Sequence, residues 1–188
     1  MSSLRYSKSS STRQSSEDAM DNFWTVKIAG VSGTGKTTVM NALKADTRFV
    51  CDVIIYSHLL NECGDKDLAD LKLANLLRGS NGLVLMDDHL EFDNPNKTVN
   101  YERENTRGLV LLDVPLGDLL ARIACDQAKK REIDPTQISR NLQLSRKKAV
   151  HLSHETKTPL LVIPNLAGDL ERSIAVISAF VLSNSPIV

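Results

Sequence analysis

The stretch Val26–Thr38, VKIAGVSGTGKTT, contains the pattern Gly-x-x-x-x-Gly-Lys-Thr between Gly30 and Thr37. Val26–Ala29 predicts a short apolar strand, and the run TTVMNALKA after the lysine predicts a helix. A glycine-rich turn between a strand and a helix points successive backbone N–H groups at phosphate oxygens, and the helix N-terminus adds partial positive charge. The stretch therefore predicts a loop that binds a nucleoside triphosphate.

The side chains that close this pattern predict ATP and Mg²⁺ as cofactors. Lys36 can reach the β- and γ-phosphates and position them for transfer, and the Thr37 hydroxyl can ligate Mg²⁺. A turn that joins strand to helix and binds nothing is disfavoured, because lysine, threonine, strand and helix all occur together. The expected ATP-binding residues of the loop are Gly30, Val31, Ser32, Gly33, Thr34, Gly35, Lys36, Thr37 and Thr38.

The gross composition limits the classes of partner. The 188 residues suffice for one well-packed domain, and 23 basic residues balance 23 acidic ones. Without a basic field, neither nucleic acid nor an anionic membrane is an expected partner, and no apolar run is long enough to span a bilayer. The cysteines, Cys51, Cys63 and Cys125, are scattered and odd in number, which indicates a reducing, cytoplasmic setting and no disulfide or zinc framework. The composition leaves the oligomeric state open.

The first 22 residues differ in kind from the rest. Serine dominates them, apolar residues are few, and Arg5, Lys8 and Arg13 precede the first acid, Glu17. Such a segment buries too little apolar surface to offset its ordering entropy, so we expect a disordered tail at 1–22 and a single domain at 23–188. An organellar transit peptide is the weaker alternative, because the required amphipathic helix is not evident.

Short apolar runs alternate with helical patterns through the domain, which predicts an α/β fold of the P-loop NTPase class, with a five-stranded parallel sheet and helices on both faces. The expected strands are Val26–Ala29, Phe49–Ile55, Leu83–Met86, Leu109–Val114 and Leu160–Ile163. Beyond the helix after the loop, we expect helices at Leu68–Leu77, Leu116–Lys129, Pro135–His154 and Leu166–Leu182. Leu68, Leu71, Leu76 and Leu77 are expected to form a core stripe. The polar stretch Glu91–Arg107 predicts a loop.

The segment Gly82–His89, GLVLMDDH, predicts a strand that ends in acidic residues. A carboxylate at this position, coupled to a phosphate-binding loop, can hold Mg²⁺ directly or through water, which makes Asp87 a candidate metal ligand and catalytic residue. Asp88 is either the same group displaced by one residue or a turn residue. His89 alone would be a structural hydrogen-bonding residue.

A basic cluster at Lys129–Arg131 follows the helix that carries Arg122 and Asp126. Cations at a helix C-terminus are often merely solvated. Beside a phosphate-binding loop, however, a mobile basic segment can close over the transferring phosphoryl group, supply positive charge and exclude water. We expect a lid at about 129–136, with Arg131 as a catalytic residue.

Taken together, these residues resemble the nucleoside monophosphate kinases, and most closely the adenylate kinases of the archaeal type. The resemblance rests on the phosphate loop, on the strand-end pair Asp87 and His89, and on a helix and lid with three further matches. The matched lid residues are Arg122, Asp126 and Arg131, with Arg146 on the following helix. The resemblance implies AMP as the first acceptor to expect, adenine packed near Arg122, and Arg131 in contact with the transferring phosphates. His89 and Arg78 are the candidate acceptor-binding residues.

The acceptor side departs from that family, because the segment YSHLLNECGDKDLADLKLANLLRGS is short and acidic. A monophosphate needs a cationic anchor, which Arg78, Arg103 or Arg107 would have to supply. The lid also has Glu132 where the family tends to have aspartate. Two alternatives therefore stay open: a small-molecule kinase with a hydroxyl acceptor oriented by Asp87 or Asp88, and a non-catalytic protein switched by ATP.

Overall fold

The computed structural model describes residues 22–48, 50–90, 105–126, 134–166 and 168–186. Its strands form one parallel sheet in the order β2-β3-β1-β4-β5. The strands are β1 Phe23–Ala29, β2 Cys51–Ile54, β3 Gly82–Asp88, β4 Thr106–Leu112 and β5 Leu160–Ile163. The helices are α1 Lys36–Lys44, α2 Tyr56–Cys63, α3 Lys66–Gly79, α5 Leu116–Cys125, α6 Pro135–Thr156 and α7 Leu170–Ser183. The predicted α/β class and five-stranded parallel sheet are confirmed.

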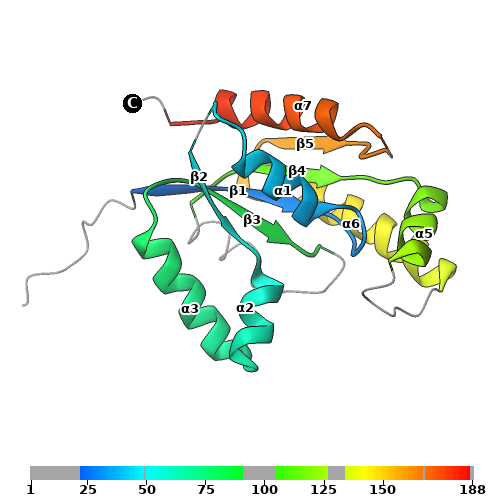
Figure 1. The fold of residues 1–188 in the computed structure, drawn as a ribbon, viewed down its shortest axis with the longest axis horizontal. Coiled ribbons are helices and arrows are strands. Elements are labelled where there is room, and N and C mark those ends of the chain that lie inside the picture. The colour runs from blue at the N-terminus through cyan, green and yellow to red at the C-terminus, as the bar shows by residue number, and fades with distance from the viewer. Residues whose placement is uncertain (1–21, 49, 91–104, 127–133, 167, 187–188) are drawn as a thin grey trace, which may run out of the picture.

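Helices cover both faces of the sheet (Figure 1). Helices α1 and α7 pack on one face, where Val39 and Ile177 join the largest apolar cluster. The opposite face is covered by α2 and α3 over β2 and β3, and by α6 over β4 and β5. Helix α5 packs with α6 beyond the carboxyl ends of the strands, around Leu119 and Leu142. Because β1 is central and buried along its whole length, the loop that follows it is held by a rigid strand.

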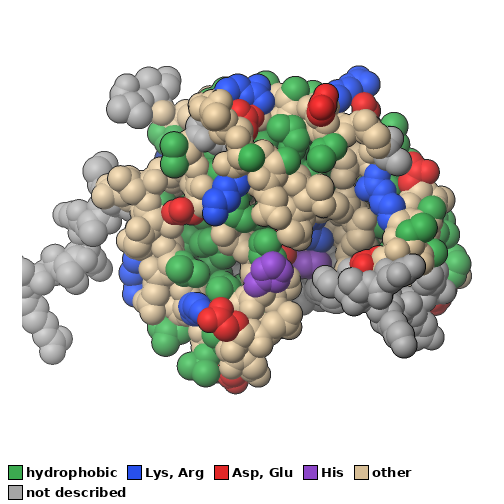
Figure 2. All heavy atoms as spheres, in the orientation of Figure 1, with side chains coloured by type: hydrophobic (Ala, Val, Ile, Leu, Met, Phe, Trp, Pro, Cys, Tyr) green, Lys and Arg blue, Asp and Glu red, His purple; other side chains and the backbone are tan. Residues whose placement is uncertain are grey.

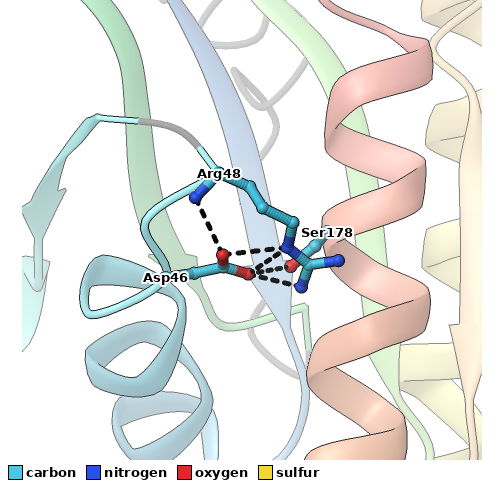
Figure 3. Close-up of polar contacts among 3 residues, drawn as sticks. All are labelled: Asp46, Arg48 and Ser178. Atoms are coloured by element: carbon cyan, nitrogen blue, oxygen red, sulfur yellow. Dashed lines mark hydrogen bonds and ion pairs between the residues drawn. The ribbon is translucent and has the colours of Figure 1, made fainter.

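A polar contact joins the end of α1 to α7 on the first of these faces (Figure 3). Asp46, just after α1, accepts hydrogen bonds from the backbone and guanidinium of Arg48 and from the hydroxyl of Ser178 on α7. The hydrogen bonds from Arg48, assisted by the one from Ser178, hold the pKa of the Asp46 carboxyl well below its usual range. The charged form of Asp46 therefore helps to fix α7 against α1.

Helices α2 and α3 differ from the sequence-based expectation. Helix α2 was not predicted, and the predicted core stripe on α3 is wrong for three of its four members. Leu68, Leu71 and Leu76 are 55%, 57% and 41% exposed, whereas Leu77 is buried. Leucines occur around most of the circumference of α3, so their spacing alone does not show which side meets β3. Ala69 and Leu77 occupy that side.

The remaining differences are at element ends. Helix α7 begins at Leu170 rather than Leu166, because Gly168 takes a left-handed conformation at φ 81° and Asp169 precedes the helix. Helix α6 begins at Pro135 with Asp134 as its cap, as predicted. The N-terminal tail, most of the polar stretch 91–107 and most of the lid lie outside the described residues. No helix in the described part of the chain combines the length and the apolar character needed to cross a bilayer.

Candidate functional site

The loop between β1 and α1 has the geometry of a phosphate cradle. Gly33 and Gly35 lie in the left-handed region, with φ of 95° and 92°, which L side chains rarely adopt. Gly30 has no room for a side chain, since a Cβ there would lie 2.6 Å from Thr34 Oγ1 and 3.0 Å from the carbonyl oxygen of Leu112. Gly35 caps α1 without a side-chain hydrogen bond, so side chains leave the first N–H groups of the helix available to an anion.

Lys36 lies folded over this loop. Its side chain is buried, and Nζ donates hydrogen bonds to the carbonyl oxygens of Gly30 and Val31. The ammonium group therefore lies against the backbone at the start of the loop. Thr37 and Thr38, in the first turn of α1, are exposed. The predicted loop residues therefore form one continuous turn between β1 and α1, with Lys36 folded back over its first residues.

Asp87 lies at the carboxyl end of β3, the strand hydrogen-bonded to β1. The register pairs Asp87 with Ile28 and Asp88 with Ala29, the residue before Gly30. Side chains alternate along a strand, so Asp87 shares the sheet face of Leu85, which packs against α1, and Asp88 points to the other face. Adjacent strands lie about 4.8 Å apart. Asp87, rather than Asp88, is thus the carboxylate on the side of the phosphate loop.

The Asp87 carboxylate also caps the neighbouring helix. The backbone N–H of Tyr56, the first residue of α2, donates to Asp87 Oδ1 at 2.7 Å. Ile55, at the cap position of α2, has no side chain that can accept this bond. The other oxygen, Oδ2, lies 3.6 Å from Nε2 of His89. The structure therefore brings Asp87 and His89 together, and joins Asp87 to the start of the acceptor-side helices.

Arg122 on α5 ties the back of the phosphate loop to the loop after β5. Its guanidinium donates to the carbonyl oxygens of Thr34 at 3.4 Å and of Asn165 at 2.6 Å. The buried amide of Asn165 donates to the same Thr34 oxygen at 2.7 Å. A Cβ on Gly35 would lie 2.9 Å from Asn165 Nδ2, so this amide packs directly against the loop. The resemblance placed adenine near Arg122, and the contacts put Arg122 at the edge of the phosphate loop.

The other arginines considered for the site lie at opposite ends of the sheet. Arg146 on α6 reaches Asp113 at the carboxyl end of β4, with Nε 2.8 Å and 3.0 Å from the two carboxylate oxygens. Arg78 lies in the last turn of α3, before β3 begins, and is therefore at the opposite end of the sheet from the loop. The six-residue rise from Gly82 to Asp88 is about 20 Å, too far for an arginine side chain. Arg107, near the start of β4, is also at that far end. Arg131 lies outside the described residues.

The placement of Arg78 corrects its expected role as an acceptor-binding residue. Sequence order suggested that role because Arg78 follows the acidic acceptor segment. Helix α3, however, runs back from the carboxyl edge of the sheet to the start of β3, and carries Arg78 away with it. Arg78 Nη1 instead donates to Asn75 Oδ1 on its own helix at 3.3 Å.

Both lysines of the α2–α3 hairpin are paired with acids of the same hairpin. Lys66 bonds Asp70, and Lys72 bonds Glu62 at 2.5 Å. The Tyr56 hydroxyl donates to Asp70 Oδ1 at 2.5 Å, and burial together with this bond raises the pKa of Tyr56. Burial works to raise the pKa of Asp70 as well, but the bonds from Lys66 and Tyr56 outweigh it, so that pKa lies below its usual value. The described hairpin thus places no arginine beside Asp87.

Sequence reasoning missed two residues of this site. Tyr56 contributes a backbone N–H, which any residue could supply, so no signal in the sequence marks it. Asn165 follows Pro164 after the last predicted strand. An amide after a parallel strand was a usable signal, because the carboxyl ends of all the strands meet at one edge.

Among the comparisons with known proteins, only the comparison with solved structures finds matches, and it bears on the fold. No protein-family model and no curated protein sequence matches the chain. Among solved structures, shikimate kinase from Acinetobacter baumannii in complex with shikimate aligns with a TM-score of 0.58 at 20% identity, over 88% of this chain and 97% of that one. A gluconokinase from Sinorhizobium meliloti aligns at 0.56 and 15% identity, over 86% and 93% of the two chains.

A third similar structure is named for a resistance function and not as a kinase. The tunicamycin resistance protein of Deinococcus radiodurans aligns with a TM-score of 0.60 at 15% identity, over 84% of this chain and 95% of that chain. At such identities the similarity establishes the fold alone. The chain therefore has the fold of small P-loop kinases, and its reaction has to be argued from its own residues.

Proposed function

We propose that the protein is an ATP-dependent kinase that transfers the γ-phosphoryl group to a hydroxyl of a small molecule. The single observation that carries the proposal is the position of Asp87. Its buried carboxylate lies one strand from the phosphate loop and on the same sheet face as α1. A carboxylate so placed can orient a hydroxyl acceptor and accept its proton.

The residues around the loop fit ATP with Mg²⁺. The exposed Thr37 hydroxyl is an oxygen ligand of the kind that Mg²⁺ prefers, and the Asp87 carboxylate would hold the ion through a water molecule, which leaves Oδ2 able to accept a proton. This ion is usually held by few protein groups together with substrate phosphates. Consistently, no cluster of three or more His, Cys, Asp or Glu side chains that could cage a metal occurs among the described residues. When bound, Mg²⁺ would neutralise charge on the phosphates. Lys36 would exchange its carbonyl partners for the β- and γ-phosphates.

The transfer can be written with these groups. The acceptor oxygen forms a bond to the γ-phosphorus while the bond from that phosphorus to the β–γ bridging oxygen breaks, which releases ADP. The hydroxyl proton passes to Asp87 Oδ2, the oxygen not bonded to Tyr56. Asp87 Oδ1 keeps its hydrogen bond to the start of α2, so the carboxylate stays oriented throughout. We further propose that Arg131 adds positive charge in the transition state.

The acceptor side supports a hydroxyl over a monophosphate. The described hairpin bears acids, and its lysines are bonded to Asp70 and Glu62. Solved structures with a similar fold include a shikimate kinase and a gluconokinase, whose named substrates both carry several hydroxyl groups. An uncharged hydroxyl compound needs no cationic anchor, whereas the carboxylates of shikimate and gluconate would need one. The acidic hairpin therefore favours an uncharged hydroxyl compound as acceptor.

A nucleoside monophosphate, AMP first, is the second candidate. The observation in its favour is the pair Asp87 and His89, which the resemblance associates with adenylate kinases and which the structure brings together. An anionic acceptor needs no general base, and Asp87 would then act only through Mg²⁺. The acceptor phosphate would have to be anchored by a residue such as Arg103, outside the described part of the chain.

A phosphoryl-transfer screen separates these candidates. The full chain is incubated with Mg²⁺ and γ-labelled ATP, and with panels of nucleoside monophosphates, sugars, polyhydroxy acids and nucleosides, and labelled products are resolved. A labelled product from a hydroxyl compound, absent with Lys36→Ala, supports the proposal. Labelled diphosphates instead identify a monophosphate kinase. ATP binding with no product in any panel leaves the ATP-switched binding protein as the better account and sinks both kinase proposals.

A further inference from the structure

Several leucines of the α2–α3 hairpin are exposed, and one of them, Leu71, lies on the side of α3 that points away from the sheet. Leu68 and Leu71 are 55% and 57% exposed and Leu76 is 41% exposed, and Leu60 on the adjoining α2 is also exposed. Apolar side chains gather on the surface over α2 and α3 in Figure 2. Single exposed leucines are normal, but several on one hairpin are typical of a surface that associates with another protein.

Charges at both ends of this face make it complementary to itself. Asp67, Leu71, Ala74 and Arg78 follow one another at intervals of four, three and four residues, which places them on one stripe of the helix. Along the helix the stripe begins with an acid and ends with a base, with a leucine and a small residue between them. When a second copy of the helix lies antiparallel to the first, the acid of each copy therefore faces the base of the other.

We propose that the outer face of α3 binds α3 of a second copy of this chain, antiparallel, about a two-fold axis between Leu71 and Ala74. Under two-fold symmetry a contact made by one residue is repeated by its counterpart. Asp67 of each copy then meets Arg78 of the other. The two ion pairs lie about 16 Å apart along the helix axis. Leu71 packs on Ala74 of the second copy, where the small side chain allows the helices to approach closely.

The nearest lysines are already bonded to other acids, although Lys66 also interacts with Asp67 electrostatically. Lys66 and Lys72 are bonded to Asp70 and Glu62 within the hairpin, and Arg78 bonds only the neutral Asn75 among the described residues. The surface is small, however. A 14-residue helix is about 21 Å long. Two such helices packed together bury less surface than the roughly 1,200–2,000 Å² that stable protein–protein interfaces bury in total. The dimer is therefore weak and dependent on concentration.

A charge-swap experiment tests this pairing. Sedimentation velocity of the full chain, from about 1 to about 300 μM, measures the monomer–dimer equilibrium in the concentration range of weak interfaces. Asp67→Arg and Arg78→Asp should each raise the dissociation constant at least about 10-fold, and the double variant should return it toward the wild-type value. Leu71→Lys should abolish association. Circular dichroism of each variant checks that α3 is intact.

Glu171→Arg is the matched control, because it reverses an exposed acid in the first turn of a different helix, α7. It should leave the dissociation constant unchanged. A wild-type protein that is monomeric over the whole range overturns the proposal. So does a dimer that both single charge reversals leave intact, or one that the double variant fails to restore.

Discussion

Asp87 Oδ1 accepts a hydrogen bond from the backbone N–H of Tyr56 at 2.7 Å, and through it the end of β3 is joined to the start of α2. One carboxylate therefore has two uses. It supplies the cap that Ile55 cannot, and it presents a second oxygen toward the side of the sheet that holds the phosphate loop. Substitutions at this position can separate the two uses.

Asp87→Asn keeps an oxygen that can accept from Tyr56 but removes the charge. We expect turnover to fall by about 10²–10⁴-fold, the usual contribution of a general base, while the free energy of unfolding changes little. Asp87→Ala should lower turnover equally and also cost about 1–2 kcal/mol of stability, because the Tyr56 N–H loses its acceptor. Steady-state rates and urea denaturation measure the two effects. Asp88→Asn, whose side chain points to the other face, is the comparison, and an equal loss of turnover there would contradict the assignment.

The sequence predicted the fold well because its strongest signals are local. The phosphate-loop pattern marks β1 and α1, and continuous apolar runs mark strands that are buried on both faces. Asp87 was predicted as a functional carboxylate because it ends such a run, and that role stays a prediction. The same reasoning failed on α3, where leucines surround the helix and only tertiary packing decides which of them are buried. It also misplaced Arg78, because closeness in sequence to the acceptor segment says nothing about which end of the sheet a helix reaches.

Arg122 is expected to act on ATP binding rather than on the chemical step. Its guanidinium bridges Thr34 of the phosphate loop and Asn165 of the loop after β5. Arg122→Ala removes the guanidinium from both carbonyl oxygens and leaves Thr34 held only by the Asn165 amide. We expect ATP binding to weaken by about 10-fold, which corresponds to about 1.4 kcal/mol, the contribution of one or two such hydrogen bonds. Arg122→Lys should recover little, because a single ammonium group does not match a planar fork.

Titration calorimetry with a non-hydrolysable ATP analogue measures this loss of affinity directly. Arg172→Ala is the control, since Arg172 is an exposed arginine of α7 that lies 3.9 Å from Asp169. Affinity that is unchanged in Arg122→Ala would show that the bridge does not shape the nucleotide site.

Gly30→Ala tests the packing behind the phosphate loop. A Cβ at Gly30 would meet Thr34 Oγ1 at 2.6 Å and the backbone oxygen of Leu112 at 3.0 Å, at a φ of 153°. We expect a loss of about 1–3 kcal/mol in the free energy of unfolding, with weaker ATP binding, because the backbone of β4 cannot move aside cheaply. Chemical denaturation measures the loss. Gly117→Ala is the matched control: no atom lies within 4 Å of a Cβ there, and its position in α5 predicts a slight gain in stability. Equal stabilities for the two variants would be incompatible with the observed loop.

The contact of Asp46 with Arg48 and Ser178 should make stability depend on pH (Figure 3). Hydrogen bonds from Arg48 lower the folded-state pKa of Asp46 below its ordinary value of 3.8. A lowered carboxyl pKa contributes stability that is complete above the unfolded-state value and is lost as the pH falls through the folded-state value. Asp46→Asn should therefore be less stable than wild type at neutral pH, and the difference should narrow below about pH 4. Urea denaturation between about pH 7 and pH 2.5 follows this difference, with Asp52→Asn on the exposed face of β2 as control. A gap between wild type and Asp46→Asn that stays constant over that interval, or widens in acid, would show that the charge of Asp46 does not hold α7 to the end of α1.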